Sequence, residues 1–65
     1  MIDTNKLKGE IKAKGFTQVS LSKELGITVQ TFNRKLGKGI FNSNEIQAMI
    51  DILSISDPMN IFFVS

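Results

Sequence analysis

The most regular spacing of apolar residues in the chain lies between residues 17 and 36. Leu21 and Leu25 are four positions apart, and Phe32 and Leu36 repeat that spacing. Side chains four residues apart lie on the same face of an α-helix. Each pair therefore predicts a short helix with one apolar face.

A tight turn is expected to join these two helices at residues 25–28. Gly26 stands where a chain leaving a helix most often needs a positive φ, which glycine adopts at little cost. Thr17 and Thr28 each precede an apolar pattern, where a hydroxyl can accept a bond from an orphan N–H of the first helical turn. Ser22 is small and lies where the two helices would cross. These features predict a helix-turn-helix unit.

The residues ahead of this unit predict another helix, from about Thr4 to Lys14. Asp3 and Thr4 are both suitable caps, and Leu7 and Ile11 provide the buried face. The glycine that follows Lys14 is a natural end for this helix.

The segment that follows the unit, residues 37–39, consists of two glycines around a lysine and predicts a flexible basic turn. Ile40 and Phe41 are then predicted to fold back onto the core. Phe16, just ahead of the unit, is predicted to enter the same core as a hydrophobic staple.

A further helix is predicted to begin within Asn42–Glu45, where a capping residue is followed three positions later by glutamate. The helix runs to about Leu53. Ile46, Ile50 and Leu53 recur about one turn apart and are predicted to form its core side.

The sequence Asp57-Pro58 predicts a last short helix or turn, with Asp57 as its cap and Pro58 at the first helical position. The predicted fold class is all-α: one domain over residues 1–65 with four or five helices. A chain of this length buries only about 60% of the surface of its unfolded form, which favours a compact helical bundle or an oligomer.

The charged residues divide the chain into a basic front part and an acidic rear part, with a net charge of +2. Every lysine and arginine lies at or before Lys38, whereas the charged residues after it are Glu45, Asp51 and Asp57. This distribution suits a protein that turns one side toward a polyanion. For any single lysine, a solvated helix surface is the simpler interpretation.

Cysteine and histidine are both absent from the chain. Their absence excludes disulfides, thiolate metal sites and the commonest general base. The six carboxylates are scattered singly rather than clustered as an enzyme requires. No apolar run approaches the ~20 residues of a membrane span, and the chain does not begin with a signal peptide. We therefore expect a cytoplasmic protein that is not an enzyme and takes no cofactor, metal, membrane or small-molecule ligand.

The second helix of the unit must turn four other side chains outward if Phe32 and Leu36 face inward. Glutamine and asparagine suit the N6/N7 edge of adenine, arginine suits the O6/N7 edge of guanine, and valine can contact a thymine methyl group. The predicted base contacts are Val29, Gln30, Asn33 and Arg34. The alternative is that the polar residues simply solvate the helix.

Phosphate contacts are predicted around this helix and at the start of the helix before it, where free N–H groups and the dipole favour a phosphate. The candidates are Thr17, Gln18, Thr28, Lys35, Lys38 and the backbone N–H of Gly39. The alternative for the threonines is capping alone, and for the lysines it is solvation.

The unit resembles the helix-turn-helix of the Cro and phage-repressor family, also called the XRE family. The resemblance is carried by Thr17-Gln18, Ser22, the turn Leu25-Gly26-Ile27-Thr28 and Phe32. The family more often has alanine in place of Ser22 and an aliphatic residue in place of Phe32.

This resemblance implies a compact lambda-repressor-like domain with its helix-turn-helix at about residues 17–36. It also implies that Gln18 grips the DNA backbone and that Val29, Gln30 and Arg34 touch bases, with Asn33 as a frequent addition.

The C-terminal part of the chain has more apolar residues than a helix of this domain can bury. An exposed apolar patch usually marks a partner surface. We predict a two-fold homodimer, which would place two recognition helices about 34 Å apart along DNA. The interface candidates are Met49, Ile52, Ile55, Met59, Phe62 and Phe63. The alternative is a monomer whose tail packs into its own core.

The leading functional prediction is a transcriptional regulator that binds double-stranded DNA in a sequence-specific way. It would read the major groove with the helix at about residues 29–36, as a dimer on an inverted repeat. This minimal layout resembles Cro-type or small prophage-encoded repressors. One alternative is a protein-interaction module on the same fold, such as an antitoxin or anti-repressor. Another is an architectural factor of the excisionase type. The outward helix face has no acidic residue, which favours DNA over a protein partner.

Overall fold

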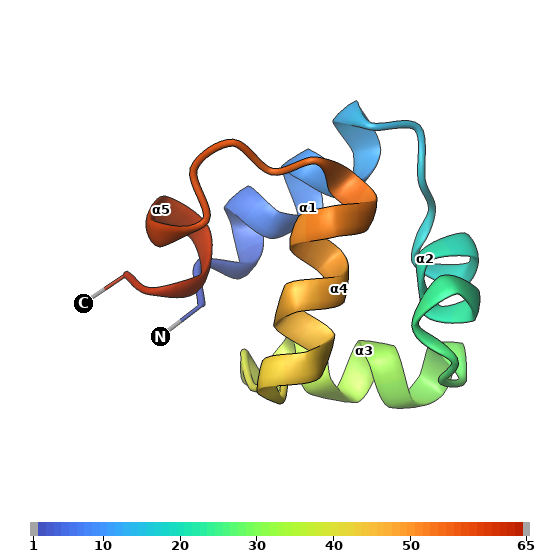
Figure 1. Ribbon diagram of the computed structural model, residues 1–65. Coiled ribbons are helices and arrows are strands. Elements are labelled where there is room, and N and C mark those ends of the chain that lie inside the picture. Colours follow the sequence, from blue (N-terminus) through green and yellow to red (C-terminus); the bar gives the residue numbers. More distant parts are fainter. Residues whose placement is uncertain (1, 65) are drawn as a thin grey trace.

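The computed structural model describes residues 2–64, which form five helices and no strand within that range. The helices are α1 (Thr4–Ala13), α2 (Gln18–Leu25), α3 (Val29–Lys38), α4 (Ser43–Leu53) and α5 (Met59–Phe62) (Figure 1). The all-α class predicted from the sequence is therefore confirmed. None of the helices in the described range is long and apolar enough to span a membrane.

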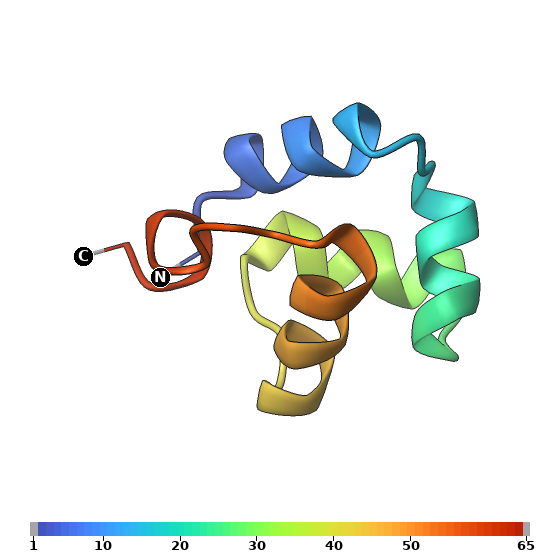
Figure 2. The ribbon, with the colours of Figure 1, turned by 45° about the horizontal axis from the view of Figure 1, so that its top comes forward.

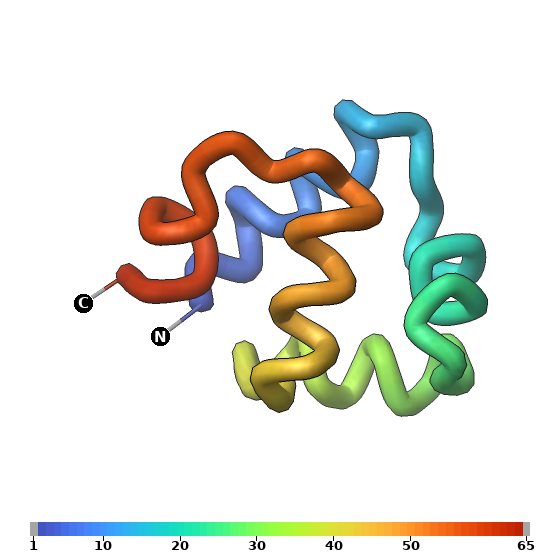
Figure 3. Tube along the Cα trace, viewed as in Figure 1, coloured from blue at the N-terminus to red at the C-terminus, as the bar shows by residue number. Residues whose placement is uncertain are grey.

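α3 lies along one edge of the molecule, at the bottom of Figure 1. α2 packs against both α3 and α4. α1 runs across the top of the molecule in Figure 2, and α5 packs against it. The tube in Figure 3 shows that the first described residues of the chain lie beside α5. The N–H of Asp3 donates to the carbonyl oxygen of Ile61 at 2.7 Å, which ties α5 to the start of the chain.

A single hydrophobic core receives side chains from all five helices. The ring of Phe32, from α3, is fully buried and lies 5.6 Å from the ring of Phe41. Burial of each large apolar side chain contributes about 1.5–3 kcal/mol relative to its exposure. The buried apolar residues are Leu7, Ile11, Leu21, Phe32, Leu36, Phe41, Met49, Leu53, Ile55, Ile61 and Phe62.

The two helices of the predicted unit and the turn between them have the expected local structure. The hydroxyl of Thr17 accepts from the N–H of Ser20 at 3.0 Å, and the hydroxyl of Thr28 caps α3. Gly26 ends α2 with a φ of 73°. Ser22 is buried, and its hydroxyl donates to a carbonyl of its own helix, so this buried hydroxyl has a hydrogen-bond partner. The predicted caps, glycine turn and small buried residue are confirmed.

Helices α1 to α4 all end in the same way. The last turn is followed by a residue with positive φ, whose N–H bonds the carbonyl three residues back, and the next N–H bonds the carbonyl five residues back. This pair of bonds is the Schellman motif, which satisfies carbonyls that a helix end leaves free. The left-handed residues are Gly15, Gly26, Gly39 and Ser54.

An apolar residue follows each of these left-handed residues, and at three of the four helix ends its side chain is covered. Phe16 and Ile27 are partly buried against the core, and Ile55 is buried within it. Ile40, at the end of α3, is 66% exposed. The prediction that Ile40 enters the core is therefore wrong, because its N–H completes the helix end while Phe41 fills the core.

The predicted turn at residues 37–39 is also corrected. α3 continues through Gly37 to Lys38, and only Gly39 takes the left-handed conformation, with a φ of 68°. A glycine inside a helix costs about 1 kcal/mol relative to alanine. The buried side chain of Leu36 and the Schellman bonds at Gly39 hold the last turn despite that cost.

The core side of α4 is rotated from the predicted one. Met49 and Leu53 are fully buried, whereas Ile46 and Ile50 are only partly buried. The capping box between Asn42 and Glu45 that starts this helix is confirmed.

Three of the predicted dimer contacts lie in the core of this chain and are corrected here: Met49, Ile55 and Phe62. All three belong to the hydrophobic core. The start of α5 also differs from the prediction, because Pro58 precedes the first helical residue and no side chain caps it.

We predict that Ser54→Gly stabilises the protein. Ser54 is the non-glycine residue with positive φ in residues 2–64, at 50°, and a side chain there costs roughly 1 kcal/mol. Glycine keeps both Schellman bonds and removes that cost, so the free energy of unfolding in urea should rise by about 0.5–1 kcal/mol. The control is Ser56→Gly, at a nearby exposed site without positive φ, which should give no gain. Equal gains for both variants would contradict the explanation.

Candidate nucleic-acid interface

The outward face of α3 presents one stripe of exposed polar side chains. These are Gln30, Asn33, Arg34 and Lys38, and none of them is acidic. The opposite face is fixed in the core by Phe32 and Leu36. Because α3 lies at the edge of the molecule, no other helix passes below it in Figure 1.

Three of the four predicted base-contacting residues are thus exposed to solvent. Gln30, Asn33 and Arg34 are exposed, and Val29 is partly buried at the first position of the helix. Capping by Thr28 places these residues within the first two turns, the part of a helix that meets base edges when it enters a major groove.

The two threonines predicted as phosphate contacts both have structural partners. The hydroxyl of Thr17 takes part in a capping box with Ser20, whose own hydroxyl accepts from the N–H of Thr17 at 2.9 Å. The hydroxyl of Thr28 accepts from the N–H of Thr31 and bonds its side chain. Capping is therefore a demonstrated role of both. Gln18, at the first position of α2, is partly buried.

Lys35 is committed within the chain rather than free for a phosphate, which corrects its predicted role. Its ammonium group lies 2.5 Å from a carboxylate oxygen of Glu45. Glu45 is buried and Lys35 is partly buried. Sequence reasoning missed this pair because it joins α3 to α4.

Glu45 is held in its charged form by its surroundings. Burial would raise the pKa of its carboxyl group, but the hydrogen bond from Lys35, the N–H of Asn42 and the charge of Lys35 together lower that pKa below its ordinary value. The same side chain thus closes the capping box of α4 and pairs with α3.

The backbone N–H of Gly39 is another predicted phosphate donor that is already used. It bonds the carbonyl of Leu36 in the Schellman ending of α3. Lys38, one residue earlier, is exposed and carries the positive charge at this end of the helix.

Three large apolar side chains are exposed at the end of the molecule where the chain begins and ends. Ile40, Met59 and Phe63 are 66%, 65% and 53% exposed, and we call them the terminal patch. Ile40 follows Gly39, which packs beside the first residues of the chain. Met59 and Phe63 lie on either side of Ile61, whose carbonyl oxygen accepts a hydrogen bond from the N–H of Asp3. Met59 and Phe63 were predicted to be interface residues, whereas Ile40 was not. Ile52, another candidate, is partly buried.

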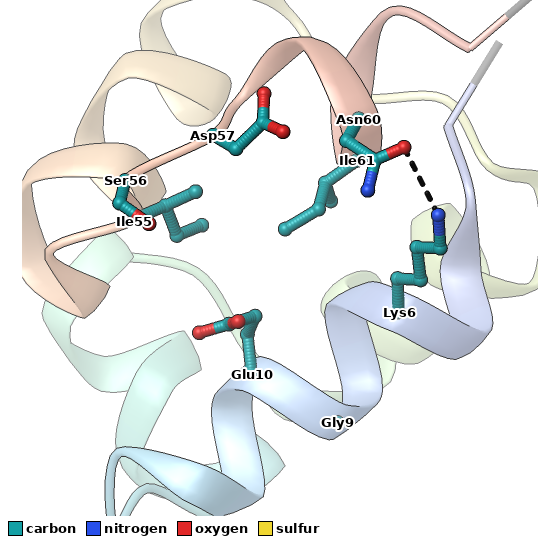
Figure 4. Close-up of a pocket in the computed structure, with 8 residues that line it drawn as sticks. All are labelled: Lys6, Gly9, Glu10, Ile55, Ser56, Asp57, Asn60 and Ile61. Atoms are coloured by element: carbon teal, nitrogen blue, oxygen red, sulfur yellow. Dashed lines mark hydrogen bonds between the residues drawn. The ribbon is translucent and has the colours of Figure 1, made fainter.

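A small cavity of about 250 Å³ lies on the side of α1 that faces α5 (Figure 4). The ammonium group of Lys6 donates to the side-chain oxygen of Asn60 at 3.0 Å across one end of it. Gly9 lies at its edge, and Glu10 and Asp57 extend from opposite sides. The bond between Lys6 and Asn60 adds a second tie between α1 and α5.

No match was found to any protein-family model, curated protein or solved structure.

We predict that Glu45→Gln destabilises the protein and weakens the dependence of its unfolding free energy on pH. The charged carboxylate stabilises the fold at pH values above its ordinary pKa of 4.5, and this contribution is lost as the pH falls through the lower pKa of the folded chain. The variant keeps an oxygen that can accept from the N–H of Asn42 but loses the charge that pairs with Lys35. It should therefore lose about 1 kcal/mol of unfolding free energy at neutral pH, the difference between a hydrogen bond to a charged group and a neutral one. As the pH falls through the lowered pKa of Glu45 in the folded chain, the variant should approach the wild type.

The matched control is Asp51→Asn, which removes an exposed carboxylate from the same helix. Urea unfolding over a pH series should give nearly the wild-type profile for this variant. A Glu45→Gln profile that runs parallel to the wild type at all pH values would contradict a charged role for Glu45.

Proposed function

We propose that the protein binds double-stranded DNA in a sequence-specific way and regulates transcription, with α3 as its recognition helix. The observation that carries this proposal is the acid-free exposed stripe of α3, formed by Gln30, Asn33, Arg34 and Lys38. Two amides and two cations on one accessible helix face match the acceptors of base edges and phosphates.

The chemistry of the stripe suggests which bases it would read. Arg34 can donate two parallel hydrogen bonds to a guanine, and Gln30 and Asn33 can each pair with the donor and acceptor of an adenine. Val29 can add a contact with a thymine methyl group. The resemblance to the Cro and phage-repressor family assigns the same residues to base contacts.

The rigid mounting of α3 supports this role. A helix that reads bases must hold its side chains in a fixed position, since a misplaced donor loses its hydrogen bond. Thr28 caps the start of α3, Phe32 and Leu36 anchor its middle, and the pair between Lys35 and Glu45 fixes its second half to α4.

Phosphate contacts would come from Lys38 beside the stripe and from Gln18 at the start of α2. The N-terminal end of a helix favours a negative charge, and Gln18 occupies the first position of α2. The basic front part of the chain would add a general attraction to DNA.

We further propose a two-fold homodimer in which the terminal patch covers its counterpart. Such a dimer would present two copies of α3 to an inverted repeat with half-sites about 34 Å apart. The support is the exposure of Ile40, Met59 and Phe63 together, because a small protein gains nothing from leaving three large apolar side chains in water.

The test of DNA binding is selection of bound duplexes from a random pool, followed by affinity measurements on the enriched sequence. We expect an inverted repeat to be enriched. Gln30→Ala and Arg34→Ala should each weaken binding by about 1–3 kcal/mol and relax selectivity at one base position. The matched control is Gln47→Ala, which removes an exposed amide from α4 and should leave affinity unchanged. Failure to enrich any sequence would rule out specific readout.

Salt provides a separate test of phosphate contact. Lys38→Ala should weaken binding to all duplexes alike and reduce the steepness with which affinity falls as salt is raised, because one fewer counterion is released. Lys23→Ala, at an exposed site on α2, is the control for a general loss of charge. Identical salt responses for the two variants would contradict a phosphate contact by Lys38.

The dimer is tested by sedimentation of the wild type and of Phe63→Ser. We expect the wild type to sediment as a dimer at micromolar concentration and Phe63→Ser to shift toward monomer, because a polar residue replaces a central apolar contact. Val19→Ser, which changes another half-exposed apolar residue outside the terminal patch, should remain dimeric. A monomeric wild type at high micromolar concentration would refute the dimer.

A further inference from the structure

A groove separates the C-terminal half of α1 from the first turn of α2. Its volume is about 370 Å³, and we call it the lysine groove. The residues that line it are Lys8, Ile11, Lys12, Phe16, Thr17 and Gln18.

The floor of the lysine groove is apolar. Ile11 and Phe16 pack against the core from opposite ends of a sharp turn at Gly15, where the N–H of Phe16 bonds the carbonyl of Ile11 at 3.0 Å. Phe16 remains partly exposed in this position. The fold therefore leaves apolar surface in a concave site, which is the usual form of a binding pocket.

The rim of the groove carries positive charge that the chain does not neutralise. Lys8 and Lys12 are both exposed and lie one helical turn apart, a spacing at which like charges repel each other. Within residues 2–64, the one ion pair is that of Lys35 with Glu45, so neither lysine of the rim has an acidic partner.

We propose that the lysine groove binds an acidic peptide segment of a partner protein through a bulky apolar side chain. The apolar side chain would cover the exposed part of Phe16 above the buried Ile11, and flanking carboxylates would pair with Lys8 and Lys12. The start of α2 forms the remaining wall, and the positive end of its dipole favours a carboxylate there. A DNA strand would satisfy the lysines, but its polar backbone would gain nothing from the apolar floor.

The groove shares Gln18 with the proposed phosphate contacts. A bound peptide would therefore keep DNA away from the start of α2 and act as an inhibitor. This consequence rests on the proposed function, whereas peptide binding by itself does not.

The test uses a synthetic peptide in which aspartate and glutamate residues flank a leucine and a phenylalanine, titrated into the full chain in the absence of DNA. We expect saturable binding and a change in the NMR signals of Phe16. Lys8→Glu combined with Lys12→Glu should weaken binding about tenfold or more, because two attractions become repulsions. A peptide with serines in place of the leucine and phenylalanine should bind at least about tenfold more weakly.

The matched control is Lys14→Glu combined with Lys23→Glu, which makes the same change in net charge at two exposed lysines outside the groove. It should retain nearly the wild-type affinity for the peptide. Equal losses in the two double variants, or no binding by the folded wild type, would overturn the proposal. So would a result in which the groove variant binds the peptide normally but loses DNA, since the groove would then belong to the DNA-binding surface. Failure of DNA binding alone would leave the peptide result standing and would overturn only the proposed function.

Discussion

The left-handed residue at the end of each helix from α1 to α4 is the constraint on which this fold depends. A chain of 65 residues has too small a core to hold loosely connected helices, so the direction of each helix must be set locally. Gly15, Gly26, Gly39 and Ser54 set it by turning the backbone within one residue and by satisfying the free carbonyls of the helix they end. The angle between α2 and α3, and with it the direction of the outward face of α3, follows from the turn at Gly26.

Glu45 links this local geometry to the tertiary structure. Its carboxylate accepts from the N–H of Asn42 at the start of α4 and pairs with Lys35 near the end of α3. A buried carboxylate is costly unless its oxygens are satisfied, and here two different partners satisfy them. The capping box would form in an isolated helix, but the pair with Lys35 requires α3 and α4 to be in place. Glu45 therefore favours this packing of the two helices over others that would bury the same apolar area.

The features that the sequence predicted correctly are those decided within a few residues. The caps at Thr17 and Thr28 and the turn at Gly26 depend on bonds between near neighbours, so their residue types suffice to identify them. Features decided by packing were missed. α4 is apolar on more than one side, and only its neighbours determine that Met49 rather than Ile46 faces the core. The outward stripe of α3 was predicted only in part. The periodicity of the helix predicts which side chains face solvent, but it does not predict that Lys35 forms an ion pair with Glu45.

The exposure of Ile40 is hard to explain within a single chain. The residue that follows the left-handed position is covered at the ends of α1, α2 and α4, where it adds an apolar contact to the Schellman bonds. The same contact would stabilise the end of α3, yet the side chain of Ile40 points into solvent. Because Phe41 already occupies the adjacent core position, a large apolar side chain at residue 40 adds no packing contact within the core. In the proposed dimer, Met59 and Phe63 of a second copy would cover Ile40 at this end of the proposed recognition helix.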